Sequence, residues 1–192
     1  MNWSKVRNGD MFGTFGPGKL SVGIKIFQKI VCRRQGIKVP KGKYPSHVGV
    51  IQRTRRDIRF IEALMGSGIT VSPFSKYADK DIEIYRFTDL AYTMPEAKQR
   101  KLFVEKMLGF EGAEYDFLGL LGIFLYALGL PFGVSFNDNK RLYCSESLGQ
   151  AALAAAYLPF FPLAKMRGDE KVPIGLFCPI HIPLSSLTFT LK

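Results

Sequence analysis

Apolar positions along the chain follow two periods, one typical of strands and one typical of helices. Short β-prone runs predict strands at about residues 9–13, 46–52, 57–63, 69–71 and 82–87. Apolar residues at helical spacing predict a helix over residues 20–31. A capping box, Thr93-Met94-Pro95-Glu96, predicts a second helix that ends at Gly109. No internal repeat or low-complexity linker divides the pattern, so one domain over residues 1–192 is the simplest account.

The runs at 46–52 and 57–63 predict a β-hairpin with a chemical consequence. A four-residue loop over residues 53–56 sets His47 directly opposite Glu62. Opposed residues share a sheet face, with Cβ atoms about 5 Å apart. Glu62 could then accept a hydrogen bond from one ring nitrogen of His47 and leave the other free to face a thiol. A slip of one residue would separate the two side chains, and the alternative is a strand-edge histidine beside a solvated glutamate.

Two long runs carry no charge. They cover residues 117–136, which contain four glycines and Pro131, and residues 147–164, which contain Pro159 and Pro162. By length alone either run could cross a membrane. Because glycine and proline interrupt them, we interpret both as buried core helices, with a hydrophobic surface patch or a membrane-contacting hairpin as the alternative.

The segment Arg141-Leu142-Tyr143-Cys144-Ser145-Glu146-Ser147-Leu148 leads from a polar loop into an Ala-rich run with high helix propensity. Cys144 is therefore expected at or just before the first turn of a helix. The helix dipole and the unpaired N–H groups there favour a thiolate and hence a nucleophile. The alternative is a buried cysteine that serves only as a small apolar residue.

The second histidine, His181, lies in a Cys178–Pro183 segment without an obvious carboxylate partner, which makes His47 the better candidate base. The three cysteines have no paired spacing, so neither a disulfide framework nor a zinc cluster is expected, and we expect no metal and no cofactor.

Charge is distributed unevenly. Residues 1–60 hold 14 Lys and Arg against two acidic residues, a net of +12, and the remaining residues hold 13 against 14, a net of −1. This basic N-terminal third could meet an anionic polymer or a membrane surface. The basic residues lack interleaved aromatics and match no nucleic-acid motif, so sequence-specific nucleic-acid binding is not expected. The first residues contain no apolar leader, which predicts synthesis in the cytoplasm and delivery by other means if the protein acts outside.

An ordered set of motifs resembles the circularly permuted branch of the NlpC-like, papain-fold cysteine hydrolases. The set is Gly9-Asp10, Ser46-His47-Val48-Gly49-Val50, Ile61-Glu62-Ala63, Tyr115-Asp116-Phe117-Leu118-Gly119-Leu120-Leu121-Gly122 and Tyr143-Cys144-Ser145-Glu146-Ser147-Leu148. The resemblance implies an α+β, papain-like fold with a small antiparallel sheet packed against the nucleophile helix. It also implies Cys144 as nucleophile, His47 as base and Glu62 as orienting acid. Tyr115 and Glu146 match recurring positions, and with Tyr143 they are candidate substrate-binding residues.

The leading functional hypothesis is a cysteine amidase or endopeptidase that cleaves a peptide amide, in particular peptidoglycan stem peptides. The resembling family occurs in bacteria and bacteriophages, so virion association or release on lysis is one expected location. Two alternatives stay open: a thiol acyltransferase or lipase at a membrane surface, and a non-enzymatic binding or virion component on the same scaffold. The sequence does not indicate an oligomeric state.

Overall fold

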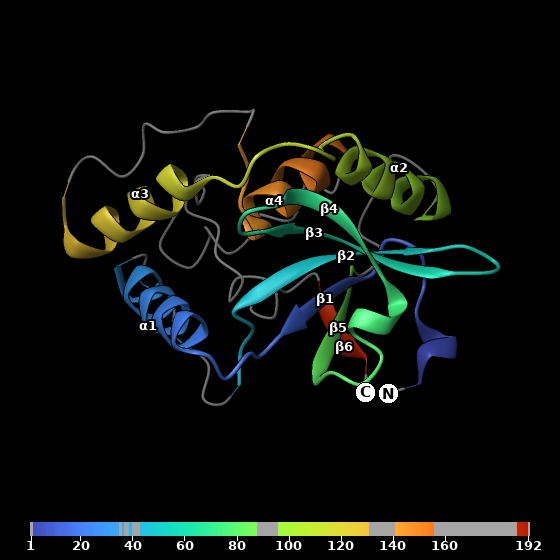
Figure 1. The fold of residues 1–192 in the computed structure, drawn as a ribbon, viewed down its shortest axis with the longest axis horizontal. Helices are drawn as coiled ribbons and strands as arrows, with labels where there is room; N and C mark the ends of the chain where they lie inside the picture. Colours follow the sequence, from blue (N-terminus) through green and yellow to red (C-terminus); the bar gives the residue numbers. More distant parts are fainter. Residues whose placement is uncertain are drawn as a thin grey trace.

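The protein has an α+β fold, in which one antiparallel sheet carries helices against it (Figure 1). The computed structural model describes residues 2–34, 36, 39, 43–87, 96–130, 141–155 and 188–191. The strands are β1 (Met11–Thr14), β2 (His47–Arg53), β3 (Ile58–Leu64), β4 (Gly68–Pro73), β5 (Ile82–Phe87) and β6 (Thr188–Leu191). The helices are α1 (Lys19–Arg34), α2 (Glu96–Leu108), α3 (Phe117–Leu128) and α4 (Cys144–Ala154), with 3-10 turns η1 (Trp3–Lys5) and η2 (Phe74–Lys76). The strand order is β4-β3-β2-β1-β5-β6.

The predicted strands and the first two helices are confirmed. The helix expected over residues 20–31 is α1, and the helix expected to end at Gly109 is α2, where the Gly109 N–H still bonds the Glu105 carbonyl. Thr93, Met94 and Pro95 of the capping box lie outside the described residues. Strand β6 was not predicted, because its four residues carry too little pattern to separate a strand from a tail.

The described parts of the two uncharged runs, residues 117–130 and 147–155, differ in burial, and residues 131–136 and 156–164 lie outside the described residues. Helix α4 is buried as predicted, with Leu148, Ala151 and Ala152 fully enclosed. The prediction of a buried core helix is wrong for α3, where Phe117, Leu118 and other large side chains are about half exposed. The reason is that α3 packs beside α1 rather than across the sheet, so only one side of it is covered (Figure 1). Among the described helices, none is both long and apolar enough to cross a membrane.

Alternation along the strands divides the apolar residues between the two faces of the sheet. One face packs against α2 and α4 through a core of aliphatic and aromatic side chains: Met11, Val48, Val50, Ile61, Tyr85, Phe103, Met107 and Leu148. The opposite face is covered by η1 and η2 through a second core: Phe12, Ile51, Phe60, Tyr77, Ile82 and Ile84. By the same alternation His47 and Glu62 belong to the second face, next to Tyr77.

The hairpin has the predicted loop length but a different register. Gly49, not His47, lies directly opposite Glu62, and the ladder extends to Arg53 opposite Ile58. The loop therefore begins at Thr54. Its hydroxyl accepts hydrogen bonds from the N–H groups of Arg56 and Asp57 and so fixes the turn. The correction is a shift of two residues, which keeps both side chains on the same face because the side-chain period of a strand is two.

The Gly9-Asp10 motif has a structural role. Asp10 is fully buried and accepts two hydrogen bonds from the guanidinium of Arg86, at 2.8 and 2.6 Å, and one from Arg100. Gly9 has a positive φ of 77°, and a Cβ there would lie 3.0 Å from the Arg100 carbonyl oxygen. Arg100 on α2 therefore neutralises a buried carboxylate that is distant in the sequence.

Candidate active site

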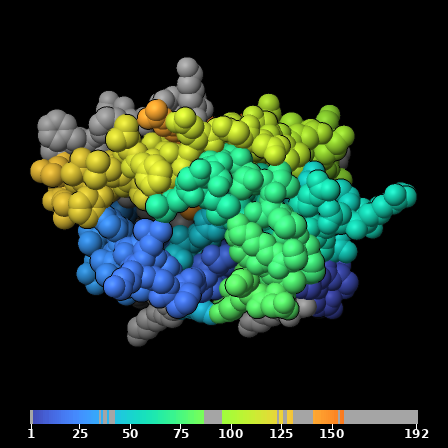
Figure 2. Space-filling view, viewed as in Figure 1, coloured from blue at the N-terminus to red at the C-terminus, as the bar shows by residue number. Residues whose placement is uncertain are grey.

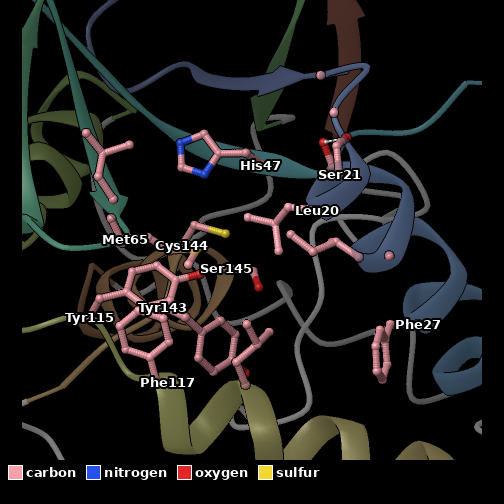
Figure 3. Close-up of a pocket in the computed structure, with 18 of the residues that line it drawn as sticks. Leu20, Ser21, Phe27, His47, Met65, Tyr115, Phe117, Tyr143, Cys144 and Ser145 are labelled. Carbon is pink, nitrogen blue, oxygen red and sulfur yellow. Dashed lines mark hydrogen bonds between the residues drawn. The ribbon is translucent and has the colours of Figure 1, made fainter.

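Cys144 is the first residue of α4, as the sequence predicts. The segment before it is fixed by a backbone hydrogen bond from Leu142 N–H to the Glu114 carbonyl and by a parallel bridge between Glu114 and Arg141. These contacts place the residues that precede α3 beside those that precede α4. Cys144 is 7% exposed, and its sulfur lies on the pocket side of the helix, below the ring of His47 (Figure 3).

His47 and Glu62 meet diagonally across β2 and β3. The distance between His47 Nε2 and Glu62 Oε2 is 2.7 Å. The diagonal contact is possible because the residue directly opposite Glu62 is Gly49, where a Cβ would lie only 2.5 Å from both the Ile61 carbonyl oxygen and the Phe12 ring. With Nε2 donating to the carboxylate, Nδ1 is the nitrogen available to the thiol.

Three further side chains hold Glu62 in its ionised form. Lys76 Nζ donates to Oε1 at 2.7 Å, Tyr77 OH donates to Oε2 at 2.5 Å, and Ser72 supplies another hydrogen bond. Burial alone would raise the pKa of Glu62, but the hydrogen bonds and charges of its partners, His47 foremost, lower it to about 2. Glu62 is therefore a fixed negative charge, with no exposed surface.

The imidazole is strongly biased toward its protonated form. Burial on its own would lower the pKa of His47, but hydrogen bonding to Cys144 and Glu62, together with their negative charges, raises it to about 9. At neutral pH the ring can therefore carry a proton as an imidazolium that faces sulfur. This is the charge distribution that a cysteine nucleophile requires.

A cavity of about 960 Å³ opens on the sulfur. Its walls are mostly apolar and come from α1, from α3 and from the turn after β3. They include Leu20, Ile24, Phe27, Leu64, Met65, Phe117, Leu120, Leu121 and Phe124 (Figure 3). The α1 wall is attached to the histidine strand by a 2.6 Å hydrogen bond between Ser21 and Ser46 and by a 3.1 Å bond from the Gln28 amide to the Pro45 carbonyl. The nucleophile therefore faces a space suited to an apolar group.

The candidate substrate-binding residues lie in different environments. Tyr115 and Tyr143 line the cavity. Burial raises the pKa of Tyr115 above its ordinary value, as do the charges of Cys144 and Asp116, which keeps the phenol a hydrogen-bond donor. Glu146 does not line the cavity: it is 1% exposed and faces the interior at the first turn of α4. The substrate-binding role of all three residues stays a prediction.

Glu146 is one half of a second buried carboxyl cluster. Burial raises its pKa to about 7, and the charge of Asp116 adds to the shift. Asp116 Oδ1 caps α3 by accepting the Gly119 N–H at 2.7 Å, and a Cβ at Gly119 would lie 2.1 Å from Oδ2. Within the described part of the chain, Asp116 Oδ2 and Glu146 Oε2 have no hydrogen-bond partner. The Asp116–Gly119 part of the motif is thus explained by helix capping.

Sequence reasoning missed Lys76, Tyr77, Ser72 and Asp116. An aspartate directly before an apolar helix is an N-cap signal that could have identified Asp116. No local signal identifies Lys76 and Tyr77, because their role depends on tertiary contact with Glu62. Cys178 and His181 lie outside the described residues.

The other described cysteine, Cys32, is buried and is not among the residues that line the cavity. Burial raises its pKa to about 12, so it is an inert thiol at neutral pH. Among the residues that the structure describes, no three His, Cys, Asp or Glu side chains form a group that could hold a metal ion.

One solved structure has a similar fold over nearly the whole chain. It is the crystal structure of metalloprotein yiiX from Escherichia coli O157:H7, DUF1105, with a TM-score of 0.58 and 14% identity. The match covers 97% of this chain and 96% of that chain. At this identity the likeness concerns the fold alone. No protein-family model and no curated protein matches this chain.

Proposed function

We propose that this protein is a cysteine hydrolase or acyltransferase that cleaves an amide or ester through a thioester on Cys144. The observation that carries the proposal is the connected set Cys144–His47–Glu62 at the mouth of an apolar cavity. The position of the nucleophile at a helix start and of the base on an antiparallel sheet also supports the circularly permuted NlpC-like, papain-like assignment.

The reaction follows from these positions. His47 Nδ1 takes the thiol proton, and the sulfur attacks the carbonyl carbon to form a C–S bond. The carbonyl electrons move onto oxygen, where the positive end of α4 stabilises them. As the intermediate collapses, the C–N or C–O bond breaks, and the imidazolium returns the proton to the leaving group. Water or another acceptor, deprotonated by His47, then attacks the thioester and frees Cys144.

The geometry favours an apolar acyl group over a polar stem peptide. The walls that face the sulfur are mainly aliphatic and aromatic, which suits a hydrocarbon chain. The amidase hypothesis for peptidoglycan stem peptides is kept as the second candidate, because the basic N-terminal third would suit an anionic wall polymer.

The test is to trap the acyl-enzyme on three substrates: a soluble short-chain ester, phospholipid vesicles and muropeptides. Intact mass and peptide mapping should find an acyl adduct on Cys144 that hydroxylamine removes, as expected for a thioester. The Cys144→Ala variant should form no adduct, whereas the matched Cys32→Ala variant should react at the wild-type rate. An adduct from muropeptides alone would establish the second candidate, and absence of any adduct on all three would contradict an enzymatic role.

A further inference from the structure

We propose that α1 and α3 form one docking surface for an anionic phospholipid bilayer, from which a lipid-borne acyl group enters the cavity. The docking rests on surface chemistry alone. The choice of a lipid-borne acyl group as substrate rests on the proposed function.

The exposed face of α3 is apolar. Phe117, Leu118, Leu121 and Leu128 are 50%, 47%, 48% and 57% exposed, and the twelve residues of the helix include no charge. Exposed leucines are ordinary when scattered, but a contiguous stripe of large apolar side chains on one helix marks a contact surface. Contact of this face with water is unfavourable, and burial of its apolar side chains in hydrocarbon is favourable.

The exposed face of α1 combines apolar and basic side chains. Val22 and Ile26 are 49% and 55% exposed, and the neighbouring positions Lys19, Lys29 and Arg33 are exposed as well. The sequence from Met11 to Arg56 contains no acidic residue. A short helix with apolar and cationic side chains on one surface is typical of interfacial membrane contact.

The exposed face of α3 and the start of α1, at Lys19 and Leu20, are continuous with the cavity. Helices α1 and α3 lie side by side at one end of the molecule, with a hollow between them (Figure 2). They touch through Phe27 and Phe124, whose ring centroids are 4.6 Å apart. Leu20, Phe117 and Leu121 are each exposed and also line the cavity. A lipid acyl chain could therefore pass from the surface toward Cys144 without crossing a polar barrier.

A bilayer explains both properties of the surface. A soluble anionic polymer would pair with Lys29 and Arg33 but would leave the leucines of α3 in water. A second copy of this chain would cover the leucines but would bring together two basic helices from molecules that each carry a net charge of +11. Anionic lipid offers negative headgroups and hydrocarbon together.

The binding test uses full-length Cys144→Ala protein, so that turnover does not alter the lipid. Cosedimentation is measured with vesicles of phosphatidylcholine alone and of phosphatidylcholine containing phosphatidylglycerol. We expect binding to the anionic vesicles, weakened on the order of 30-fold by Lys29→Gln with Arg33→Gln, at about fivefold for each charge. The matched control is Lys98→Gln with Lys106→Gln on the exposed side of α2, which removes the same charge and should leave binding within about twofold.

The apolar contribution is tested separately. Leu121→Ser should weaken vesicle binding about tenfold, and Leu121→Met should restore it. Unchanged binding of Leu121→Ser, together with equal binding to soluble polyglutamate, would replace the bilayer by a polyanion and overturn the proposal. A wild-type dimer that Leu121→Ser converts to a monomer would assign the face to a second copy and would also overturn it.

Activity on the soluble short-chain ester separates this inference from the proposed function. If the ester is cleaved and no variant on α1 or α3 changes vesicle binding, docking is wrong and the cysteine chemistry stands. If vesicles are bound as expected but Cys144 is never acylated, the surface stands and the enzymatic role fails, and the lipid-borne substrate fails with it.

Discussion

Two glutamates at the site are equally buried and have opposite electrostatic environments. Glu62 receives hydrogen bonds from His47, Lys76 and Tyr77, and its pKa is about 2. Glu146 faces another carboxyl, keeps one oxygen without a partner among the described residues, and has a pKa of about 7. Burial acts on both in the same direction, so the difference comes from the number and sign of the groups around each carboxyl. One glutamate can orient a base, and the other is mostly protonated below pH 7.

The largest expected effect is on turnover, which should depend on the His47–Glu62 cluster and not on the Glu146–Asp116 cluster. His47→Ala should lower turnover of the soluble ester by about 10²- to 10⁴-fold, because it removes the base that receives the thiol proton. Glu146→Gln should change turnover by less than about tenfold, because Glu146 does not line the cavity. Steady-state kinetics measure both variants. The rate of Cys144 alkylation by iodoacetamide, with Cys32 as the internal reference, provides a second measurement.

Stability at pH 6 should show the next largest difference. Glu62→Gln leaves Lys76 and His47 without their negative partner and should lower the free energy of unfolding by about 3–5 kcal/mol. Glu146→Gln replaces a largely neutral carboxyl by a neutral amide and should cost less than about 1 kcal/mol. Urea unfolding monitored by circular dichroism measures both variants. Equal losses would show that the two carboxyls do not differ in charge.

The sequence predicted part of the Glu62 cluster, namely the pairing of Glu62 with His47. The alternation of residues 46–52 and 57–63 placed His47 and Glu62 on one face, and the two-residue error in register did not change that face. Tyr77 and Lys76 could not be predicted, because their contacts with Glu62 depend on how η2 folds back onto β3. Asp10 and Arg100 are 90 residues apart, and no local pattern links them.

The exposure of α3 shows a second limit. Its apolar composition is compatible with a core helix, a membrane contact or a surface stripe, and only the position of α1 beside it decides among them. In α4 the small residues Ala151 and Ala152 allow close approach to the sheet, so the same lack of charge leads to burial.

The change of the free energy of unfolding with pH should have opposite signs for Glu62 and Glu146. The folded pKa of Glu62 lies below the ordinary value of 4.5, so its contribution is present above pH 4.5 and is lost as the pH falls toward 2. The folded pKa of Glu146 lies above 4.5, so stability falls as the pH rises from about 4.5 to 7, by up to roughly 3 kcal/mol. Unfolding curves across this range should show a downward slope in the wild type that Glu146→Gln flattens. A slope unchanged in the variant would assign it to other groups.

His47 determines how stability changes with pH on the alkaline side. Its folded pKa of about 9 exceeds the ordinary 6.5, so its stabilising contribution is complete below pH 6.5 and is lost as the pH rises through 9. Glu62→Gln removes one of the two groups that raise the pKa of His47. The alkaline limb of the pH–rate profile of Cys144 alkylation, which reports the loss of the His47 proton, should therefore move to lower pH. Glu146→Gln should leave the limb in place.

The smallest expected effect tests one hydrogen bond within the Glu62 cluster. Tyr77→Phe removes the donor that shares Oε2 with His47, and it should cost about 1.5–3 kcal/mol, because the acceptor is charged and buried. Oε2 then has His47 as its remaining close donor, so the His47 bond should strengthen and the alkaline limb should move slightly upward. The matched control is Tyr85→Phe, which loses a 2.8 Å hydrogen bond to Glu83 outside the Glu62 cluster and should lower stability without moving the limb. A downward shift in Tyr77→Phe would mean that the phenol supports the imidazolium rather than competing with it for the carboxylate.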